Sequence, residues 1–311
     1  MDTILTRCGY ERRSLLAGKT TVVMATCQSR IECLMLSLFS LLLRSSLQLE
    51  HIIVAINGPD SRTGDPSLQD AKQSFLEELR DTRWQASGHD RDMPLTVLRT
   101  WSRIGHGHAM DAAIPWVHTE LYTLMHDDVI VKTSDWCPYT FKALEDRKVG
   151  FVYAPPLLST GLSVVEFNGG RKINLPHPAT VLVSSRKELY TGMGLRWYGY
   201  HLPGRFDLQE ADVNRLVAFH EPDGTHIPSP GGYDCISMDV CTWVYSRLKK
   251  AGYKFEALPR DYVLHLTAMS WRDEQSQGEA FHAHRDTISL LEREIKSHPP
   301  FARLYEKYCA W

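Results

Sequence analysis

Two adjacent aspartates, Asp127 and Asp128, follow the apolar segment Leu121–Met125 and precede a second apolar trio, Val129–Val131. The first segment has β-branched and aromatic members without helical spacing, which predicts a buried strand. Two carboxylates at the end of a buried strand are unfavourable unless a cation neutralises them. Mg²⁺ or Mn²⁺ would suit such oxygen ligands and commonly bridges to substrate phosphates. An acidic turn that closes the strand is the alternative, and the two acids alone favour that turn.

Other polar segments follow predicted strands in the first half of the chain. The β-branched run Thr20–Thr26 predicts a central strand, and His51–Ile56 predicts a second one that ends in the turn Asn57–Asp60. A third strand, near Leu95–Trp101, leads into Arg103–Asp111. Parallel sheets bind ligands at the carboxyl ends of their strands. We therefore expect these segments and the two aspartates to converge on one crevice.

Helices alternate with these strands. Leucines at helical spacing predict a helix from Arg30 to Ser46, a polar helix is expected over Ser67–Arg83, and a third helix ends near His118. This alternation predicts an α/β fold in which a mostly parallel central sheet is flanked by helices on both faces.

The second half of the chain is less regular. Its expected elements, in chain order, are strands over Val149–Pro155 and Thr180–Ser185, a helix over Asp239–Gly252, a strand over Tyr253–Leu258, an extended segment over Tyr262–His265 and a helix over His284–Tyr308. The segment His201–Gly232 is rich in Pro, Gly, His and acids and predicts a long loop, and such loops usually cover or form a site. No linker divides the chain, so a single domain over residues 1–311 is expected.

The composition is typical of a globular chain, with 43% hydrophobic and 23% charged residues. A net charge of −2 provides no general attraction to nucleic acid or an anionic membrane. The seven cysteines include no C-x-x-C pair, which favours reduced thiols over a disulfide framework. The chain start lacks the features of a signal peptide, and the most apolar run, Ile31–Leu43, is too short to span a bilayer. We therefore expect a soluble, cytoplasmic protein without membrane insertion.

The ordered set of motifs from about Thr20 to Trp271 resembles the GT-A glycosyltransferases, and most of all the large family-2 group that uses nucleotide-sugar donors. The matches, in chain order, are the turn Asn57–Asp60, Gly105 and Asp111 at the spacing of a G-x-x-x-x-x-N segment, the DXD-like acids Asp127 and Asp128, Gly231–Asp234, Asp239–Cys241, Arg247, Ala251–Tyr253, Pro259 and His265. The resemblance implies a GT-A (nucleotide-diphospho-sugar transferase) fold. Residues 20–131 would form its donor-binding half, 132–271 its acceptor-side, catalytic half and 272–311 a helical extension.

The resemblance also implies a hexosyltransferase that moves a sugar from a UDP-sugar, for example UDP-glucose, to an acceptor hydroxyl, with Mn²⁺ or Mg²⁺ as cofactor. Asp128 and His265 would be the protein ligands of the ion, which bridges the two donor phosphates. Arg103 would add positive charge beside the diphosphate. The remaining donor contacts are expected from Thr26, Gln28, Arg30, Asn57, Asp60, Asp111 and Asp127.

Inverting transfer requires a carboxylate that deprotonates the acceptor hydroxyl. The position where inverting members often carry this base is Ser237, and His126 occupies the position of the family's usual first acid. Either Asp239 or Asp234 is therefore expected to be the base, or the mechanism is not simple inversion. Asp239 is equally suited to cap the helix that it begins.

Aromatic residues near the predicted long loop are candidates for stacking against the acceptor. These are Trp197, Tyr198 and Tyr233. Core packing is the open alternative for the first two. The acceptor itself stays open among a polysaccharide, a protein side chain, a small molecule and a hydroxymethylated DNA base.

Two other functions stay open. A nucleotidyltransferase shares the sheet and the metal, but it normally needs a Gly-rich loop after the first strand, and Thr26–Arg30 contains no glycine. A non-catalytic module that recognises glycan or nucleic acid is compatible with the departures at His126 and Ser237.

Overall fold

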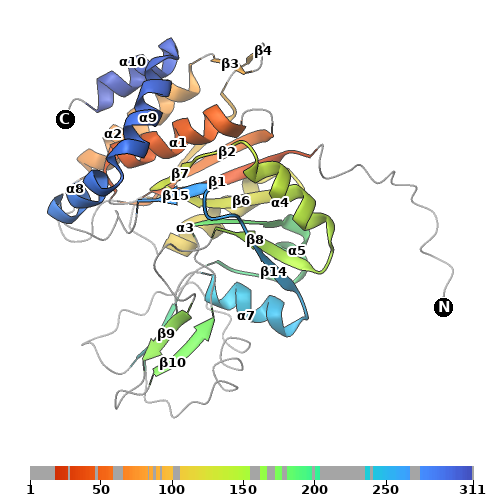
Figure 1. The fold of residues 1–311 in the computed structure, drawn as a ribbon. Coiled ribbons are helices and arrows are strands. Elements are labelled where there is room, and N and C mark those ends of the chain that lie inside the picture. Colours follow the sequence, from red (N-terminus) through yellow and green to blue (C-terminus); the bar gives the residue numbers. More distant parts are fainter. Residues whose placement is uncertain are drawn as a thin grey trace.

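The computed structural model of the chain describes residues 18–26, 29–45, 48–58, 66–82, 84–86, 89–91, 93–100, 106–154, 162–166, 172–176, 181–197, 200–203, 235–238, 241–266 and 274–309. A seven-stranded sheet lies at its centre (Figure 1). Its strands are β1 (Thr20–Thr26), β2 (Leu49–Ile56), β5 (Leu95–Arg99), β6 (Leu121–His126), β8 (Val149–Tyr153), β11 (Leu182–Arg186) and β14 (Lys254–Ala257).

The spatial order of these strands is β14-β8-β11-β6-β1-β2-β5. β1 pairs in parallel with both β2 and β6, β2 pairs in parallel with β5, and β14 pairs in parallel with β8. β11 runs antiparallel to its neighbours β6 and β8. The predicted α/β class with a mostly parallel sheet is therefore confirmed.

Helices cover both faces of the sheet because its strands alternate their apolar side chains. Val22 and Met24 of β1 belong to one hydrophobic core, and Val23 and Ala25 belong to the other. The first core includes α1 (Ile31–Ser45), α2 (Ser67–Arg80), α4 (Trp136–Glu145), α9 (Arg285–Lys296) and α10 (Pro299–Tyr308). The second includes α3 (His106–Ala113), the short 3-10 helix η2 (Ile114–Trp116), α5 (Lys187–Gly192) and α7 (Thr242–Lys250).

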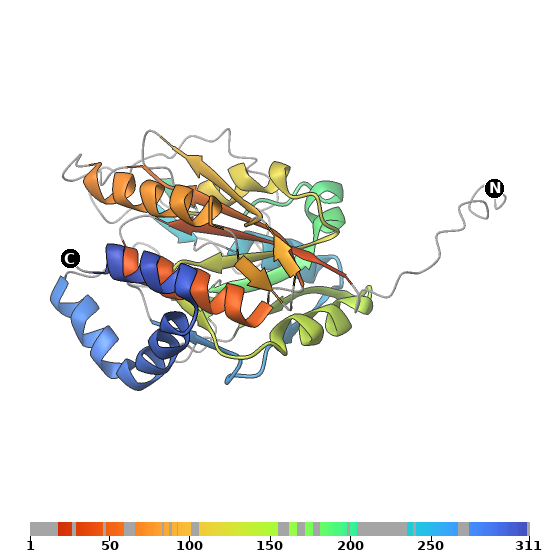
Figure 2. The same cartoon turned by 90° about the horizontal axis from the view of Figure 1, so that it is seen from above.

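The apolar run that is too short for a membrane forms the core helix α1. This helix contacts β7 (Val129–Val131), α9 and α10, and most of its residues are buried. The blue carboxyl-terminal helices lie against the orange-red α1 in Figure 2. The rings of Phe39 and Phe301, for example, lie 4.9 Å apart between α1 and α10. None of the helices in the described part of the chain has the length and apolar character needed to cross a membrane.

The predicted single helix over His284–Tyr308 is wrong. The segment forms two helices, α9 and α10, which are separated at Ser297 and His298. Pro299 begins α10 because proline is tolerated in the first turn of a helix, but it disfavours helical geometry in the residue before it. The adjacent prolines at positions 299 and 300 are the sequence signal from which this break could have been predicted. Three further helices of the described residues were not predicted: α4, α5 and α8 (Glu274–Ala283).

The predicted long loop is also partly wrong at its start. Tyr200–Pro203 forms the strand β12, which pairs antiparallel with β13 (Cys235–Met238). Two other hairpins without a sequence prediction are β9 (Leu162–Glu166) with β10 (Lys172–Pro176), and β3 (Trp84–Ala86) with β4 (His89–Arg91). Residues 204–234 lie outside the described part of the chain.

Candidate metal and donor site

The turn between β6 and β7 carries the two aspartates at the carboxyl edge of the sheet. Because β6, β1 and β2 are parallel neighbours, this turn lies at the same edge as the ends of β1 and β2. β7 then pairs antiparallel with β15 (Val263–His265), in a register that places Val129 opposite His265. The backbone N–H of Leu266 donates to the Asp128 carbonyl over 2.9 Å. This pairing brings His265 beside the turn.

Asp128 lies between two histidines. The Nε2 atom of His265 is 3.3 Å from Oδ1 of Asp128, and Nδ1 of His126 is 3.9 Å from the same oxygen. One possible ligand atom from each of the three residues lies within 4.8 Å of the others. The predicted metal ligands Asp128 and His265 therefore lie together, and His126 joins them.

The donor set of this cluster fits a divalent metal ion. Carboxylate oxygen and imidazole nitrogen are both common metal ligands. Two ligands that each bind one ion at about 2.1 Å can be at most about 4.2 Å apart, and both distances to Asp128 satisfy that limit.

Asp127 faces a different partner from its neighbour. The ammonium Nζ of Lys72, a residue of α2, lies 3.9 Å from Oδ2 of Asp127, and the Lys72 side chain is completely buried. Lys72 also donates to the hydroxyls of Thr26, over 2.7 Å, and Ser29, over 3.3 Å. The Ser29 hydroxyl donates in turn to Asp127. The two adjacent acids thus have different partners: the buried Lys72 neutralises Asp127, and two histidines flank Asp128.

Sequence analysis missed Lys72 and Ser29. A signal for Lys72 exists, because it precedes the buried Phe75, Leu76 and Leu79 by three, four and seven residues and so shares their face of α2. A lysine in such a stripe must be buried and needs a partner. Nothing comparable in the sequence distinguishes Ser29.

The carboxylates also influence Cys33, which lies on the first turn of α1. Burial, together with the charges of Asp127 and Asp128, raises the pKa of the Cys33 thiol well above its usual value. The thiol is therefore neutral and belongs to the core rather than to the chemistry of the site.

Another histidine lies near the cluster. His284, at the amino end of α9, has its pKa lowered by burial and by the charge of His265.

Three predicted donor residues lie at or near the carboxyl edge. Thr26 ends β1 and accepts from Lys72. Asn57 follows β2, where it is buried, donates its backbone N–H to the Thr26 carbonyl over 2.8 Å and accepts from the Thr100 hydroxyl over 3.3 Å. The guanidinium of Arg30 pairs with Glu32 over 2.9 Å and lies 5.5 Å from the centre of the Phe281 ring of α8.

Asp111 and Trp197, two predicted site residues, contact each other. The Asp111 carboxylate accepts from the Trp197 backbone N–H over 2.9 Å and from the Tyr190 hydroxyl over 3.0 Å. Burial and the nearby Asp111 charge raise the pKa of Tyr190, so its phenol stays protonated as a donor. The Trp197 ring is 0% exposed, and its Nε1–H donates to the Tyr122 hydroxyl over 3.0 Å. Trp197 therefore packs the second core, and its position does not support the acceptor contact predicted for it.

Several predicted site residues lie outside the described part of the chain. These are Gln28, Asp60, Arg103, Tyr198, Tyr233, Asp234 and Asp239.

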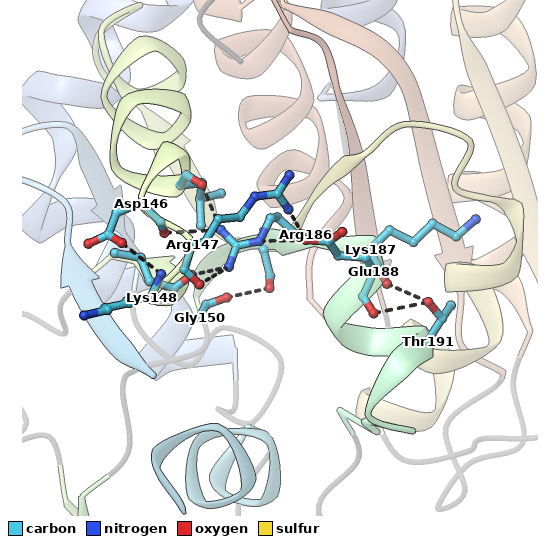
Figure 3. A network of polar contacts seen from close by, with 11 residues as sticks. Asp146, Arg147, Lys148, Gly150, Arg186, Lys187, Glu188 and Thr191 are labelled. Atoms are coloured by element: carbon cyan, nitrogen blue, oxygen red, sulfur yellow. Dashed lines mark hydrogen bonds and ion pairs between the residues drawn. The ribbon is translucent and has the colours of Figure 1, made fainter. Parts of the chain in front are cut away.

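A cavity of about 340 Å³ lies at the opposite edge of the sheet, where β6 begins and β11 ends. Its basic residues support the fold (Figure 3). Arg186 donates to the carbonyls of Leu144 and Val149, over 2.8 and 2.7 Å, and Arg147 pairs with Glu188. Lys187 donates to the Val117 carbonyl. Because it lies at the opposite edge of the sheet, this cavity is separate from the aspartates at the carboxyl edge.

No protein-family model matches the chain, and no curated protein matches it significantly. Among solved structures, similar ones include the 1–349 fragment of TarS from S. aureus, alone, in complex with UDP and in complex with UDP-GlcNAc. The identities are 11 to 12%, the TM-scores are 0.38 to 0.39, and the alignments cover 58% of this chain and 48 to 50% of that fragment. The chain thus matches about half the length of the TarS fragment.

Proposed function

We propose that the chain is a GT-A-type glycosyltransferase that uses a divalent metal ion to move a hexose from a UDP-sugar to an acceptor hydroxyl. The observation that carries the proposal is the 3.3 Å separation between His265 Nε2 and Asp128 Oδ1 at the carboxyl edge of a mostly parallel sheet. Such edges are where open α/β sheets bind ligands. The same two residues are those that the family resemblance implies as ligands of one ion.

In this reaction the bond between the anomeric carbon and the phosphate oxygen breaks, and the diphosphate leaves with the electron pair. The acceptor oxygen forms the new bond to that carbon while its proton passes to a base. A bound Mn²⁺ or Mg²⁺ would stabilise the negative charge on the departing diphosphate. Asp128 and His265 would hold this ion, and Asp239 or Asp234 would accept the proton.

The other residues of the edge would bind the donor. Asn57 and Asp60 would contact the nucleoside, because both follow β2 in the chain. Asp127 would lie near the ribose or the donor sugar, held in one orientation by Lys72 and Ser29. Further donor contacts are proposed for Thr26, Gln28, Arg30, Arg103 and Asp111. Tyr198 and Tyr233 would contact the acceptor.

The test is the release of nucleoside diphosphate from a panel of UDP-, GDP- and dTDP-sugars, each with Mn²⁺, with Mg²⁺ or with EDTA. We expect slow hydrolysis of a UDP-sugar that depends on the ion. Asp128→Asn should reduce it by more than about 100-fold, because changes even to residues that only hydrogen-bond a metal ligand typically lower metal affinity or activity by 10- to 100-fold. Asp81→Asn is the matched control, since that side chain is 73% exposed where α2 ends.

Circular dichroism and thermal unfolding would establish that each variant is folded. Unchanged hydrolysis by folded Asp128→Asn would contradict the metal assignment. The glycosyltransferase proposal itself would be contradicted if the protein hydrolysed none of these donors and none of them raised its unfolding temperature.

A further inference from the structure

His126 occupies a position in the cluster that the family resemblance does not explain. It is the last residue of β6, two residues before Asp128, and its ring centre lies 6.1 Å from that of His265. The two rings are nearly perpendicular, at 80°, and a nitrogen of each approaches the same carboxylate oxygen of Asp128. Three elements thus supply one side chain each: β6, the turn after it, and β15.

We infer that His126 is a third protein ligand, and that the resulting set of two imidazoles and one carboxylate selects a transition-metal ion such as Mn²⁺, Fe²⁺, Co²⁺ or Zn²⁺ over Mg²⁺. This inference rests on the metal site of the proposed function but not on sugar transfer. The ion would also bind in the absence of nucleotide, because the protein alone provides three ligands.

The geometry needs only a small adjustment to hold one ion. The two distances to Asp128, 3.3 and 3.9 Å, already fall below the limit of about 4.2 Å for ligands of one ion. The three ligand atoms lie within 4.8 Å of one another. A shift of one imidazole nitrogen by less than about 1 Å is therefore sufficient to bring every pair within the limit of about 4.2 Å. The side chains of His126 and His265 are 24% and 20% exposed, which gives the rings room to move and an ion a path to them.

The charges around the cluster favour a divalent ion at Asp128. Lys72 neutralises Asp127, so of these two adjacent acids Asp128 is the one that directs its charge to the cluster. One carboxylate and two neutral imidazoles around a divalent ion leave a net charge of about +1, which attracts an anionic ligand such as a diphosphate. Three protein ligands with further positions open are typical of catalytic rather than structural metal sites.

The choice of ion follows from the nitrogen ligands. Mg²⁺ is a hard cation that prefers an octahedral shell of oxygens and gives up its water reluctantly. Imidazole nitrogen binds the later first-row divalent ions progressively more tightly. A site of oxygen ligands alone would show a weaker preference, so metal selectivity reports on imidazole binding, and the loss of affinity in a His126 variant reports on His126 itself.

The experiment is calorimetric titration of the full chain with Mn²⁺, Co²⁺, Zn²⁺ and Mg²⁺ in the absence of nucleotide, together with the visible absorption spectrum of the Co²⁺ form. We expect Co²⁺ to bind at least tenfold more tightly than Mg²⁺. His126→Ala should weaken Co²⁺ binding at least tenfold and shift the Co²⁺ spectrum, as the loss of a nitrogen ligand requires. His118→Ala, at an exposed histidine near the opposite edge, should change neither.

Two comparisons keep the inference separate from the proposed function. If His126→Ala and the more conservative His126→Asn both bind Co²⁺ as the unmodified chain does, while Asp128→Asn and His265→Ala do not bind, the inference is overturned and the two-ligand site stands. If all of these variants lose Co²⁺ but the unmodified chain hydrolyses no nucleotide-sugar, the inference stands and the proposed function fails. Equal affinity for Mg²⁺ and Co²⁺, or binding of neither, would overturn the inference.

Discussion

The Lys72 ammonium lies 3.9 Å from the Asp127 carboxylate, and both side chains are buried beneath the carboxyl edge of the sheet. This pair joins α2 to the turn after β6, two elements that the sequence gives no reason to connect. It also explains how two adjacent aspartates are tolerated at the end of a buried strand. One is neutralised within the protein, and the charge of the other is left for the histidine cluster.

Replacing Lys72 by Met should destabilise the fold strongly. The substitution keeps the approximate volume but leaves Asp127 buried without its cation, which typically costs about 3–5 kcal/mol of unfolding free energy. Urea denaturation measures this cost. The double variant Lys72→Met with Asp127→Asn should be less destabilised than the sum of the single variants, because removing both charges also removes the mismatch. Additive effects of the two substitutions would show that the pair does not interact.

Replacing Arg186 by Lys should weaken the attachment of α4 to the sheet. The buried guanidinium donates to the carbonyls of Leu144, Arg147 and Val149, over 2.8, 3.1 and 2.7 Å, and a single ammonium cannot match that fork (Figure 3). We expect a loss of about 2–4 kcal/mol in urea denaturation, since hydrogen bonds to charged groups contribute about 1.5–3 kcal/mol each.

The matched control for that experiment is Arg147→Lys in the same network. Arg147 is 71% exposed and pairs with the exposed Glu188, so this substitution should change stability by less than about 1 kcal/mol. Equal effects at positions 147 and 186 would contradict the role assigned to the buried guanidinium.

Replacing Trp197 by Phe tests whether this residue packs the core or binds the acceptor. The change removes the donor to the buried Tyr122 hydroxyl and should cost about 1–3 kcal/mol, as unsatisfied buried polar groups do. Tyr122→Phe should have a smaller added effect in the Trp197→Phe background than alone. Once an acceptor is found, its KM should be the same for folded Trp197→Phe. A raised KM with unchanged stability would instead support the acceptor role.

Local patterns in the sequence predicted much of the fold. The strand over Thr20–Thr26 has the predicted bounds, and α1 begins and ends within one residue of the prediction. These elements are recognisable because the periodicity of a strand or a helix involves only residues close together in the chain. The break at Pro299 is also local, and the proline pair could have predicted it. The elements without a clear period, such as the short hairpins, were missed.

The candidate site shows the same division between local and tertiary information. The placement of Asp127 and Asp128 at the end of a central strand could be predicted from local patterns, because strand and turn residues are adjacent in the chain. Three other features became known from the packed structure: Lys72 lies beside Asp127, His126 and His265 both lie beside Asp128, and Trp197 is buried in the core. The partner of a buried charge depends on which distant elements pack together, and no periodicity in the chain records that choice.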